Sequence, residues 1–365
     1  MPNADIATED APESGTASQH GLMELPEVSI ESYNLEIREG RRFVGDKASG
    51  RAFRALLDKV QAQAGDLAEE SDIGDEKLAE MKKKEWDRLL TNGDANAAAI
   101  IHSAVEEFSQ NLAAVVRRYL RHKSWRGVKK VAVGGGLRRS RVGELSIART
   151  EVILKGEDID IGLVPLLHHP DEGGLIGALH LLLPWLDEAY DSALTVDIGG
   201  ANIRAGILRL NRHKAADLSR SEVIASELWR YRDVEPKRDE ALDHLGGMLR
   251  ELAEHAEEKR LALAPHIGVG CPGRIEADGS IAQGAQNLPG NWEAASFNLP
   301  AAIHERIPYI GGSRSSVVLH NDAVMQGLSE IPRMRDVKRW AVLTIGTGLG
   351  NAVFANADGG KRKAM

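Results

Sequence analysis

The sequence has a single cysteine and no long hydrophobic run. Cys271 has no second cysteine with which to form an intrachain disulfide, and a zinc site built from several cysteines is excluded. Apolar runs such as Leu179–Leu186 are too short to span a bilayer. The start of the chain, MPNADIATEDAPESG, lacks the basic and apolar regions of a secretory signal. We therefore expect a cytoplasmic protein in which Cys271 is a small buried residue rather than a nucleophile.

Lys and Arg are absent from the first 37 positions, where the chain has eight acidic residues. The formal net charge of −8 therefore belongs to this segment, and residues 38–365 carry 46 acidic and 46 basic side chains. A balanced body provides no general positive field for nucleic acid. We expect neither a nucleic-acid nor a membrane partner, and we predict that residues 1–23 form a disordered acidic tail.

The chain is long enough for two hydrophobic cores, since it has 365 residues of which 42% are hydrophobic. Helical patterns begin near Ser49 and Asn96, and a third covers Gly174–Leu183. Strand patterns alternate with these helices, over 24–43, 131–133, 194–210, 266–275, 317–321 and 340–354. Strands and helices that alternate in two separate sets predict an α/β protein with two lobes and a cleft between them.

Three of the predicted strands end in glycine turns. Gly134–Gly136 follows one strand, Gly199 and Gly200 form the tip of a hairpin that begins with Asp197, and Gly346–Gly348 forms another tip. Without a Cβ, backbone N–H groups can approach phosphate oxygens closely, and a neighbouring carboxylate can hold Mg²⁺, usually through water. One such tip is more often only a turn. Three together favour a phosphate site.

Asn321 and Asp322 lie where a buried strand meets the start of a helix. Two interpretations are open. The pair can be a simple helix N-cap. Alternatively, Asp322 can accept the proton of a bound hydroxyl while Asn321 hydrogen-bonds the same ligand. Both can hold together, because a ligand can meet the helix dipole at a capping position.

Five segments of the chain resemble the ROK family of sugar kinases (glucokinase-like, in the actin-like ATPase superfamily). In that family they are, in the same order, the first phosphate loop, a structural glycine turn, a sugar-contacting loop, the catalytic segment and the second phosphate loop. Here they are LTVDIGGANIRAG (194–206), GVGCPGRIEADG (268–279), QNLPGNW (286–292), LHNDAVMQGLSE (319–330) and LTIGTGLGNAVF (343–354). The resemblance implies a two-lobed actin-like ATPase (ribonuclease H-like) fold.

The part that follows the second phosphate loop in the family resembles the front of this chain. The matching segments are 45–53, 92–116, 128–140 and 168–181. The resemblance thus implies a circular permutation, joined near Pro184–Ala193, and the strand with Leu343–Ile345 should pair with strands from the first half. The implied domains are a tail (1–23), a C-terminal-type lobe (24–170 plus 338–356) and an N-terminal-type lobe (171–337).

The resemblance further implies ATP-dependent phosphorylation of a sugar hydroxyl, on a hexose or an N-acylhexosamine. Asp322 would be the general base, and Asn287, Asn291 and Asn321 would hold the sugar beside it. Asp197 would lie near Mg²⁺, and the adenosine would contact the turn after residue 133. The implied nucleotide contacts are Asp197, Gly199, Gly200, Asn202, Gly346, Thr347, Gly348, Gly134, Gly135 and Gly136.

Several positions depart from the family pattern. Ala201 replaces a common Thr and Asn202 a frequent Lys in the first phosphate loop, and His320 precedes Asn321 where the family commonly has an acid. The Cys-rich zinc loop and its Gly-His motif have no counterpart, so no zinc site is expected. The Glu and His that hold sugar hydroxyls in relatives are not identified, with Glu24, Glu27 and Glu31 as the candidates.

Two alternatives to the kinase share its fold. One is a non-catalytic protein that senses a sugar or a nucleotide, which the altered phosphate loop and the missing zinc motif favour. The other is an assembly or chaperone ATPase, which would not need the sugar segments. A DNA-binding regulator is disfavoured, because the acidic residues 1–37 cannot be a helix-turn-helix. The resemblance also allows a homodimer.

Overall fold

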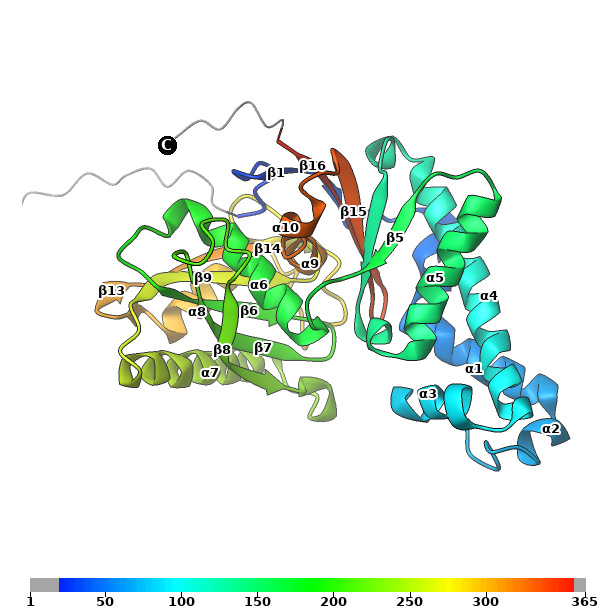
Figure 1. The fold of residues 1–365 in the computed structure, drawn as a ribbon. Helices are drawn as coiled ribbons and strands as arrows, with labels where there is room; N and C mark the ends of the chain where they lie inside the picture. The colour runs from blue at the N-terminus through cyan, green and yellow to red at the C-terminus, as the bar shows by residue number, and fades with distance from the viewer. Residues whose placement is uncertain (1–19, 358–365) are drawn as a thin grey trace, which may run out of the picture.

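The computed structural model describes residues 20–357 and contains two lobes, each built on a five-stranded mixed sheet (Figure 1). We call them the continuous lobe, whose sheet comes from one stretch of chain, and the split lobe, whose sheet comes from both ends of the chain. None of the helices in residues 20–357 is both long enough and apolar enough to cross a membrane.

The sheet of the continuous lobe has the order β14-β9-β6-β7-β8. Its strands are β6 (Ser192–Ile198), β7 (Ile203–Arg209), β8 (Glu222–Trp229), β9 (Leu263–Cys271) and β14 (Ser316–Asn321). β7 is antiparallel to both of its neighbours, whereas β9 is parallel to β6 and β14. Every residue of β6 is buried, because helices cover both faces of this central strand.

The sheet of the split lobe has the order β1-β16-β15-β4-β5. Its strands are β1 (Val28–Tyr33), β4 (Lys130–Gly134), β5 (Gly162–Pro165), β15 (Arg339–Ile345) and β16 (Leu349–Asn356). β15 is parallel to β4, with Leu343 opposite Val133, so the pairing expected between Leu343–Ile345 and the first half of the chain is present. β16 is antiparallel to β15 and β1, and β4 is parallel to β5. The two sheets therefore share one order and one set of strand directions.

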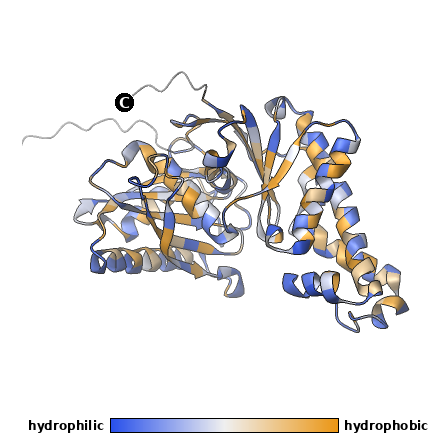
Figure 2. Ribbon diagram, viewed as in Figure 1, coloured by the Kyte–Doolittle hydropathy of each residue, from blue (hydrophilic) through white to orange (hydrophobic). Residues whose placement is uncertain are grey.

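Helices pack on these sheets with their apolar sides inward (Figure 2). In α4, for example, Ile101, Val105, Phe108 and Leu112 recur every three or four residues and are buried, and Asp94 caps the helix by accepting from the amide of Ala97. The helices are α1 (Gly50–Ala64), α2 (Asp66–Glu69), α3 (Lys83–Asn92), α4 (Ala95–Leu120), α5 (Arg141–Gly156), α6 (Pro170–Leu182), α7 (Arg238–Glu258), α8 (Leu299–Arg306), α9 (Asp322–Leu328) and α10 (Ile331–Met334).

Three two-stranded ribbons lie outside the two main sheets in residues 20–357, and an isolated bridge joins Glu24 to Ser29 of β1. The ribbons are β2 (Arg38–Glu39) with β3 (Arg42–Phe43), β10 (Arg274–Ile275) with β11 (Ile281–Gln283), and β12 (Tyr309–Ile310) with β13 (Ser313–Arg314). The ribbon of β10 and β11 lies directly after β9 and shapes one wall of the cleft described below.

The two lobes share an apolar core. Val342 and Phe354 of the split-lobe sheet are buried in one cluster with Val324 and Leu328 of α9. A Cβ at Gly327 would lie 2.3 Å from the ring of Phe354, so the absence of a side chain there lets α9 rest on this ring. The base of the space between the lobes is therefore tightly packed.

The residues that the structure describes begin at residue 20, before the predicted tail boundary at residue 23. Within the predicted tail, the amide of Gly21 donates to the carbonyl of Leu319 in β14 (2.9 Å), and His320 bonds the carbonyl of Leu22 (3.0 Å). β14 is an edge strand whose backbone groups need partners, and residues 20–23 supply some of them. The prediction of disorder is therefore wrong for residues 20–23, and its remainder, 1–19, lies outside the described residues.

Candidate functional site

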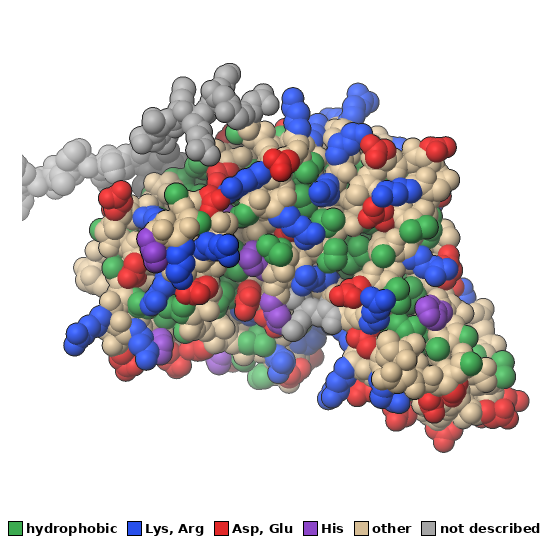
Figure 3. All heavy atoms as spheres, viewed as in Figure 1, with side chains coloured by type: hydrophobic (Ala, Val, Ile, Leu, Met, Phe, Trp, Pro, Cys, Tyr) green, Lys and Arg blue, Asp and Glu red, His purple; other side chains and the backbone are tan. Residues whose placement is uncertain are grey.

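A cleft of about 800 Å³ lies between the two lobes. The surface is indented between the lobes, and acidic and basic side chains are interspersed around it (Figure 3). Strand ends and turns from both lobes line the cleft. It brings together most of the predicted site residues, namely Asp197, Gly199, Gly200, Asn202, Asn287, Asp322, Gly346, Thr347, Gly348, Gly135 and Gly136.

The hairpin between β6 and β7 offers N–H groups to the cleft. Its carbonyls have donors: Tyr231 donates to Gly199 (2.7 Å) and Arg232 to Gly200 (2.9 Å). In contrast, the amides of Gly200 and Ala201 have no acceptor among the described residues. A Cβ on Gly199 would meet no atom closer than 3.6 Å, so packing does not require glycine there. The tip is therefore suited to an anion.

The hairpin between β15 and β16 is built in the same way. The amide of Gly346 donates to the carbonyl of Gly348 (2.9 Å), and the carbonyl of Gly346 accepts from Gly50 at the start of α1 (2.9 Å). The amides of Thr347 and Gly348 have no acceptor in residues 20–357. A Cβ on Gly348 would meet nothing within 4 Å. The two hairpins thus present free amides from opposite lobes.

The third glycine turn, after β4, differs from these two. A Cβ on Gly134 would lie 1.9 Å from Leu166, and Gly134 is not among the residues that line the cleft. Gly135 has φ of +93°, and a Cβ there would lie 2.2 Å from the carbonyl oxygen of Ile345. Backbone conformation and packing thus account for these two glycines, and the turn adds less support for a phosphate site than its sequence suggested.

Asn321 caps α9, which confirms the first interpretation of this position. Its Oδ1 accepts from Ala323 (2.9 Å) and Val324 (3.3 Å), and its Nδ2 donates to the carbonyl of Gly273 (2.9 Å). Asn321 is buried and does not line the cleft, although Asp322 beside it does. The cap therefore positions the first residue of α9 at the cleft, and the contact of Asn321 with a ligand stays a prediction.

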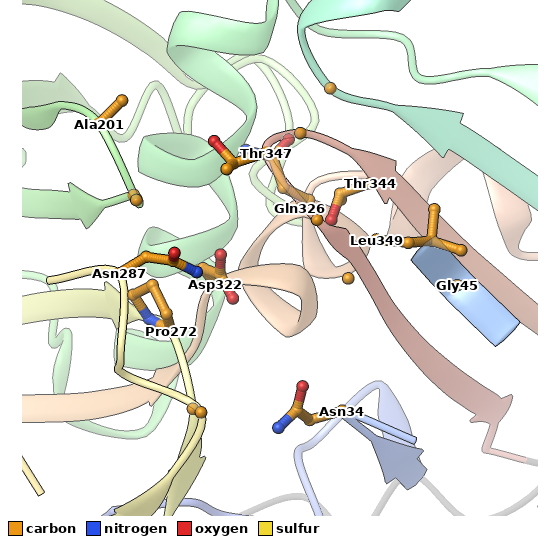
Figure 4. A pocket seen from close by; sticks show the side chains of 18 of the residues that line it. Asn34, Gly45, Ala201, Pro272, Asn287, Asp322, Gln326, Thr344, Thr347 and Leu349 are labelled. Atoms are coloured by element: carbon orange, nitrogen blue, oxygen red, sulfur yellow. The ribbon is translucent and has the colours of Figure 1, made fainter. Parts of the chain in front are cut away.

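Asp322 is an acid of the cleft whose pKa is strongly raised. Burial raises its pKa to about 7, and the neighbouring charge of Asp197 adds to the shift. No ion pair with a Lys or Arg is found for Asp322 in the described part of the chain. A carboxylate whose pKa lies near neutrality can take up a proton and release it again, which is what a general base requires. Figure 4 shows its side chain beside that of Asn287.

Asp197 is the second carboxylate of the cleft, and it has a cationic partner. Burial raises its pKa, whereas Arg204 lowers it and Asp171 raises it. The Arg204 guanidinium lies 3.5 Å from Asp197 and 2.5 Å from Asp171. Arg204 stands directly opposite Asp197 in the pairing of β6 with β7. Arg204 and Asp171 were both missed from the sequence, although the strand register places Arg204 beside Asp197.

Two further cleft residues escaped the sequence analysis. Lys83, at the start of α3, donates to the carbonyl of Gly136 (2.6 Å). Its charged surroundings in sequence were typical of a solvated helix face, and only the tertiary structure brings it to the turn after β4. Asn34 lines the cleft from the split lobe, directly after β1. No motif marks it.

Other predicted sugar ligands lie elsewhere. Asn291 does not line the cleft, and its Oδ1 accepts from the amide of Glu293 (3.0 Å). The three glutamates considered for sugar hydroxyls do not line the cleft either, and their contact with a sugar stays a prediction. Their partners are Ser29 for Glu24, His180 for Glu27 and Arg339 for Glu31. All three lie in β1 or in the turn before it, away from the hairpin tips.

The carboxylates suit Mg²⁺ only together with phosphate oxygens. Within residues 20–357 there is no group of three or more His, Cys, Asp or Glu side chains that could hold a metal ion by itself. Mg²⁺ is commonly bound by one or two carboxylates and completed by phosphate and water. The charge of Asp197 raises the pKa of Asp322, and a cation between the two carboxylates would relieve this repulsion. The residues therefore fit a magnesium nucleotide better than a bare ion.

Comparisons with known proteins found distant similarities. No protein-family model and no curated protein matches the chain. Among solved structures, a proposed N-acetylmannosamine kinase from Listeria monocytogenes is 23% identical, with a TM-score of 0.33 over 47% of this chain and 51% of its own. A proposed sugar kinase from Cytophaga hutchinsonii is 16% identical, with a TM-score of 0.30 over 48% and 52%.

An exopolyphosphatase from Cytophaga hutchinsonii is 15% identical, with a TM-score of 0.22 over 49% of this chain and 52% of its own. The matched part of this chain thus spans about half the length of each of these structures. All three are similar to it at a TM-score below 0.5, so the functional argument rests on the cleft. The chain itself is an α/β protein with two mixed five-stranded sheets around that cleft.

Proposed function

We propose that this protein transfers a phosphoryl group from ATP to a hydroxyl of a sugar, a hexose or an N-acylhexosamine. One observation carries the proposal. Asp322, an acid whose pKa is raised to about 7, shares a cleft with two glycine hairpins whose amides are free. Phosphoryl transfer depends chiefly on positioning and charge neutralisation, and a carboxylate that accepts the hydroxyl proton completes it.

Each wall of the cleft has a part in this reaction. The amides of Gly200 and Ala201 bind phosphate oxygens from one side, and those of Thr347 and Gly348 bind them from the other. Asp322 accepts the proton of the attacking hydroxyl. Asp197 is the residue that would hold Mg²⁺, through water, and the ion supplies positive charge that neutralises the phosphates. Asn287 lies beside Asp322 and orients the sugar.

We also propose that the fold is a circularly permuted actin-like ATPase fold. If the split lobe is counted from β15, its strands follow the order of the continuous lobe: two antiparallel hairpin strands, a third antiparallel strand, then two parallel strands. In this order β1 takes the place after β16, although it precedes β16 along the chain. The proposed lobes are 24–170 plus 338–356, and 171–337.

The test is an assay with ATP, Mg²⁺ and a panel of neutral hexoses and N-acetylhexosamines. We expect phosphorylated sugar from the wild type and a loss of about 10²–10⁴-fold in kcat for Asp322→Asn. Nucleotide binding, measured by calorimetry, should change little. Asp160→Asn is the matched control, because that side chain is 91% exposed. Ordinary turnover by Asp322→Asn would contradict the assignment.

A second candidate is a sensor that binds the same ligands without turnover. Two observations favour it: Ala201 offers no hydroxyl to phosphate, and Arg204 already neutralises Asp197, where Mg²⁺ would add its charge. The same panel separates the two functions. Sugar or nucleotide binding with no phosphorylated product would support the sensor and contradict the kinase.

A further inference from the structure

His320 is the residue directly before the N-cap of α9, and both of its ring nitrogens have partners. The side chain is fully buried. Its Nδ1 lies 2.7 Å from the amide nitrogen of Asn321, and its Nε2 lies 3.0 Å from the carbonyl oxygen of Leu22. His320 therefore connects the turn that leads to Asp322 with the segment of chain that precedes β1.

The two partners decide which nitrogen of His320 carries the proton. The amide of Asn321 can only donate, so Nδ1 accepts, and the carbonyl of Leu22 can only accept, so Nε2 donates. Burial lowers the pKa of His320 to about 4, although the bond to Leu22 opposes this shift. The ring is thus neutral at neutral pH, and a neutral imidazole has the one donor and one acceptor that these partners need.

Asn321 passes the position of this ring on to Asp322. Its amide is held by His320, and its side chain caps α9 and donates to the carbonyl of Gly273 (2.9 Å). The Asp322 carboxylate accepts from the amide of Ala323 (2.9 Å), and no Lys or Arg is found paired with it in residues 20–357. The direction of the Asp322 carboxylate therefore depends on the backbone of this turn.

Residues 20–23, which we call the strap, lie along the open edge of β14. The amide of Gly21 donates to the carbonyl of Leu319 (2.9 Å), which fixes the strap to β14. The carbonyl of Met23 accepts from the amide of Ile30 in β1 (2.7 Å), which fixes it to the split lobe. The carbonyl between these two anchors is the one that accepts from the imidazole.

Tyr33 of β1 contacts the same imidazole from the split lobe. The rings of Tyr33 and His320 meet edge to face, with centroids 5.0 Å apart and 69° between their planes, which is a favourable arrangement. The Tyr33 hydroxyl donates to the carbonyl of Ile275 (3.1 Å) and accepts from its amide (3.3 Å). His320 is therefore held by a hydrogen bond from the strap and by a ring that is itself fixed across the lobes.

Gly21 allows the strap to lie this close to the continuous lobe. It has φ of +60°, and a Cβ there would lie 2.7 Å from the carbonyl oxygen of Ile275. Both the left-handed conformation and the close approach require glycine. A side chain at position 21 would push the strap away from the lobe and would move the Leu22 carbonyl away from His320.

We infer that His320 is a positioning residue for Asp322, and that the strap sets the orientation of His320 through the Leu22 carbonyl. This inference rests on the proposed function, because it assigns how the general base of that reaction is held. His320 does not line the cleft, so it acts through the amide of Asn321 rather than on a substrate. A base that is slightly misplaced slows proton transfer although the substrates still bind.

The first test separates the two hydrogen bonds of His320. In His320→Asn, Oδ1 is bonded to Cγ as Nδ1 is in histidine, so the acceptor for Asn321 remains. In His320→Gln, Nε2 is two bonds beyond Cγ as it is in histidine, so the donor to Leu22 remains. We expect kcat to fall about ten-fold in His320→Gln and less than about three-fold in His320→Asn, with KM for ATP within about two-fold of the wild type.

This order of kcat values distinguishes positioning from packing. Both replacements remove part of a buried ring, so urea denaturation should show a loss of stability in both variants. If packing alone mattered, kcat would fall equally in the two variants. Equal losses of kcat, no loss in either variant, or a larger loss in His320→Asn would each overturn the role of His320.

The second test displaces the strap without changing His320. Gly21→Ala should lower kcat about ten-fold and leave KM for ATP unchanged. Gly74→Ala is the matched control, since Gly74 has the same φ of +60° but a Cβ there meets no atom within 4 Å. Its kcat should equal that of the wild type. Equal kcat values of Gly21→Ala and the control would overturn the role of the strap.

A double variant shows whether the strap and His320 act along one path. When His320→Gln has already broken the contact with Asn321, displacing the strap should cost nothing more. Gly21→Ala combined with His320→Gln should therefore lose about ten-fold in kcat, as each single variant does. A loss of about a hundred-fold, the product of two independent effects, would overturn the shared path.

Hydrogen exchange separates a failure of positioning from a failure of catalysis. If the wild type phosphorylates no sugar, the kinase proposal fails, and exchange of the amides of residues 321–324, followed by mass spectrometry, still tests His320. The exchange rate should rise about ten-fold in His320→Gln and in Gly21→Ala and should not change in Gly74→Ala. An unchanged rate in all three variants would overturn the positioning role, and turnover by the wild type would then leave the kinase proposal intact.

Discussion

The hairpin tips at 199–202 and 346–348 and the turn at 134–136 contain the same residue type for different reasons. A Cβ added on Gly199 would make only ordinary van der Waals contact and one on Gly348 would enter open space, whereas one on Gly135 would collide with the carbonyl of Ile345. A glycine that packing demands is evidence about the fold. A glycine that neither packing nor a left-handed φ demands is evidence that something else must approach the backbone.

Asp197 and Asp322, two carboxylates of the cleft, also differ in what surrounds them. Arg204 opposes the rise in the pKa of Asp197, whereas Asp322 gains most of its shift from burial and from the charge of Asp197. A fixed cation favours the ionised form of a carboxylate, which suits a structural or metal-facing role. One without a cation can exchange a proton near neutral pH, as a base does.

The largest expected effect is on stability at the packing glycine. Gly135→Ala should lower the free energy of unfolding by about 3 kcal/mol or more, because the methyl group meets backbone and the φ of +93° is unfavourable for alanine. Urea denaturation measures the change. Gly156→Ala is the control, since a Cβ at the end of α5 meets no atom within 4 Å. Equal stabilities of Gly135→Ala and the Gly156→Ala control would contradict the distinction between the turn at 134–136 and the two hairpin tips.

The second prediction concerns the pH dependence that follows from Asp322. Its pKa is raised from 3.8 to about 7 on folding, so the stability it contributes is present below pH 3.8 and is lost as pH rises through 7. Asp322→Asn removes this loss and should become more stable relative to the wild type as pH increases. Thermal unfolding of both proteins across that range measures it. A constant difference would contradict the assigned shift.

The same pKa should appear in catalysis. Because the base must be ionised, kcat/KM of the wild type should fall about ten-fold per pH unit below pH 7 and level off above it. An initial-rate profile with saturating ATP tests this. A profile that is flat from pH 5 to 8 would show that Asp322 does not accept the proton.

A smaller effect is expected at the cleft glycine. Gly348→Ala should weaken nucleotide binding about five-fold, because its methyl group occupies space where phosphate approaches, while the free energy of unfolding stays unchanged. Calorimetric titration with the magnesium nucleotide measures the affinity, and denaturation measures the stability. Loss of stability without loss of affinity would place Gly348 in the same class as Gly135.

The smallest expected effect is a gain in nucleotide affinity. Ala201→Thr adds a hydroxyl at a tip whose amide lacks an acceptor, and it should tighten nucleotide binding about two- to three-fold. Ala201→Val is the matched control, since it adds similar bulk without a hydroxyl. If both variants bind alike, the hydroxyl does not face the phosphates.

Much of the fold could be predicted because its signals are local. The alternation of strand and helix patterns predicted two lobes, and the buried strand that ends at Asn321, directly before Asp322, was placed correctly. The tail boundary was wrong, since residues 20–23 are held by the edge of β14, a partner almost 300 residues away along the chain. Edge pairing of this kind leaves no mark on local composition.

The site could be predicted only in part, for the same reason. Asp197, Asp322 and the two hairpins were found because strand ends and glycines have sequence signatures. Asn34 and Lys83 have none, and their places in the cleft depend on which surface faces them. The glutamates considered for sugar contact do not line the cleft, and no motif had singled them out.

By itself the sequence determined the elements, the balanced charge of residues 38–365 and the turns at which a ligand could meet backbone. Only the tertiary structure decided which glycines are open, which carboxylate has a cation, and that β15 and β16 complete a sheet begun near the other end of the chain. The reason is physical. Periodicity and turn preference act between neighbours in sequence, whereas burial, pKa and the space beside a Cα are set by residues that are remote along the chain and adjacent in space.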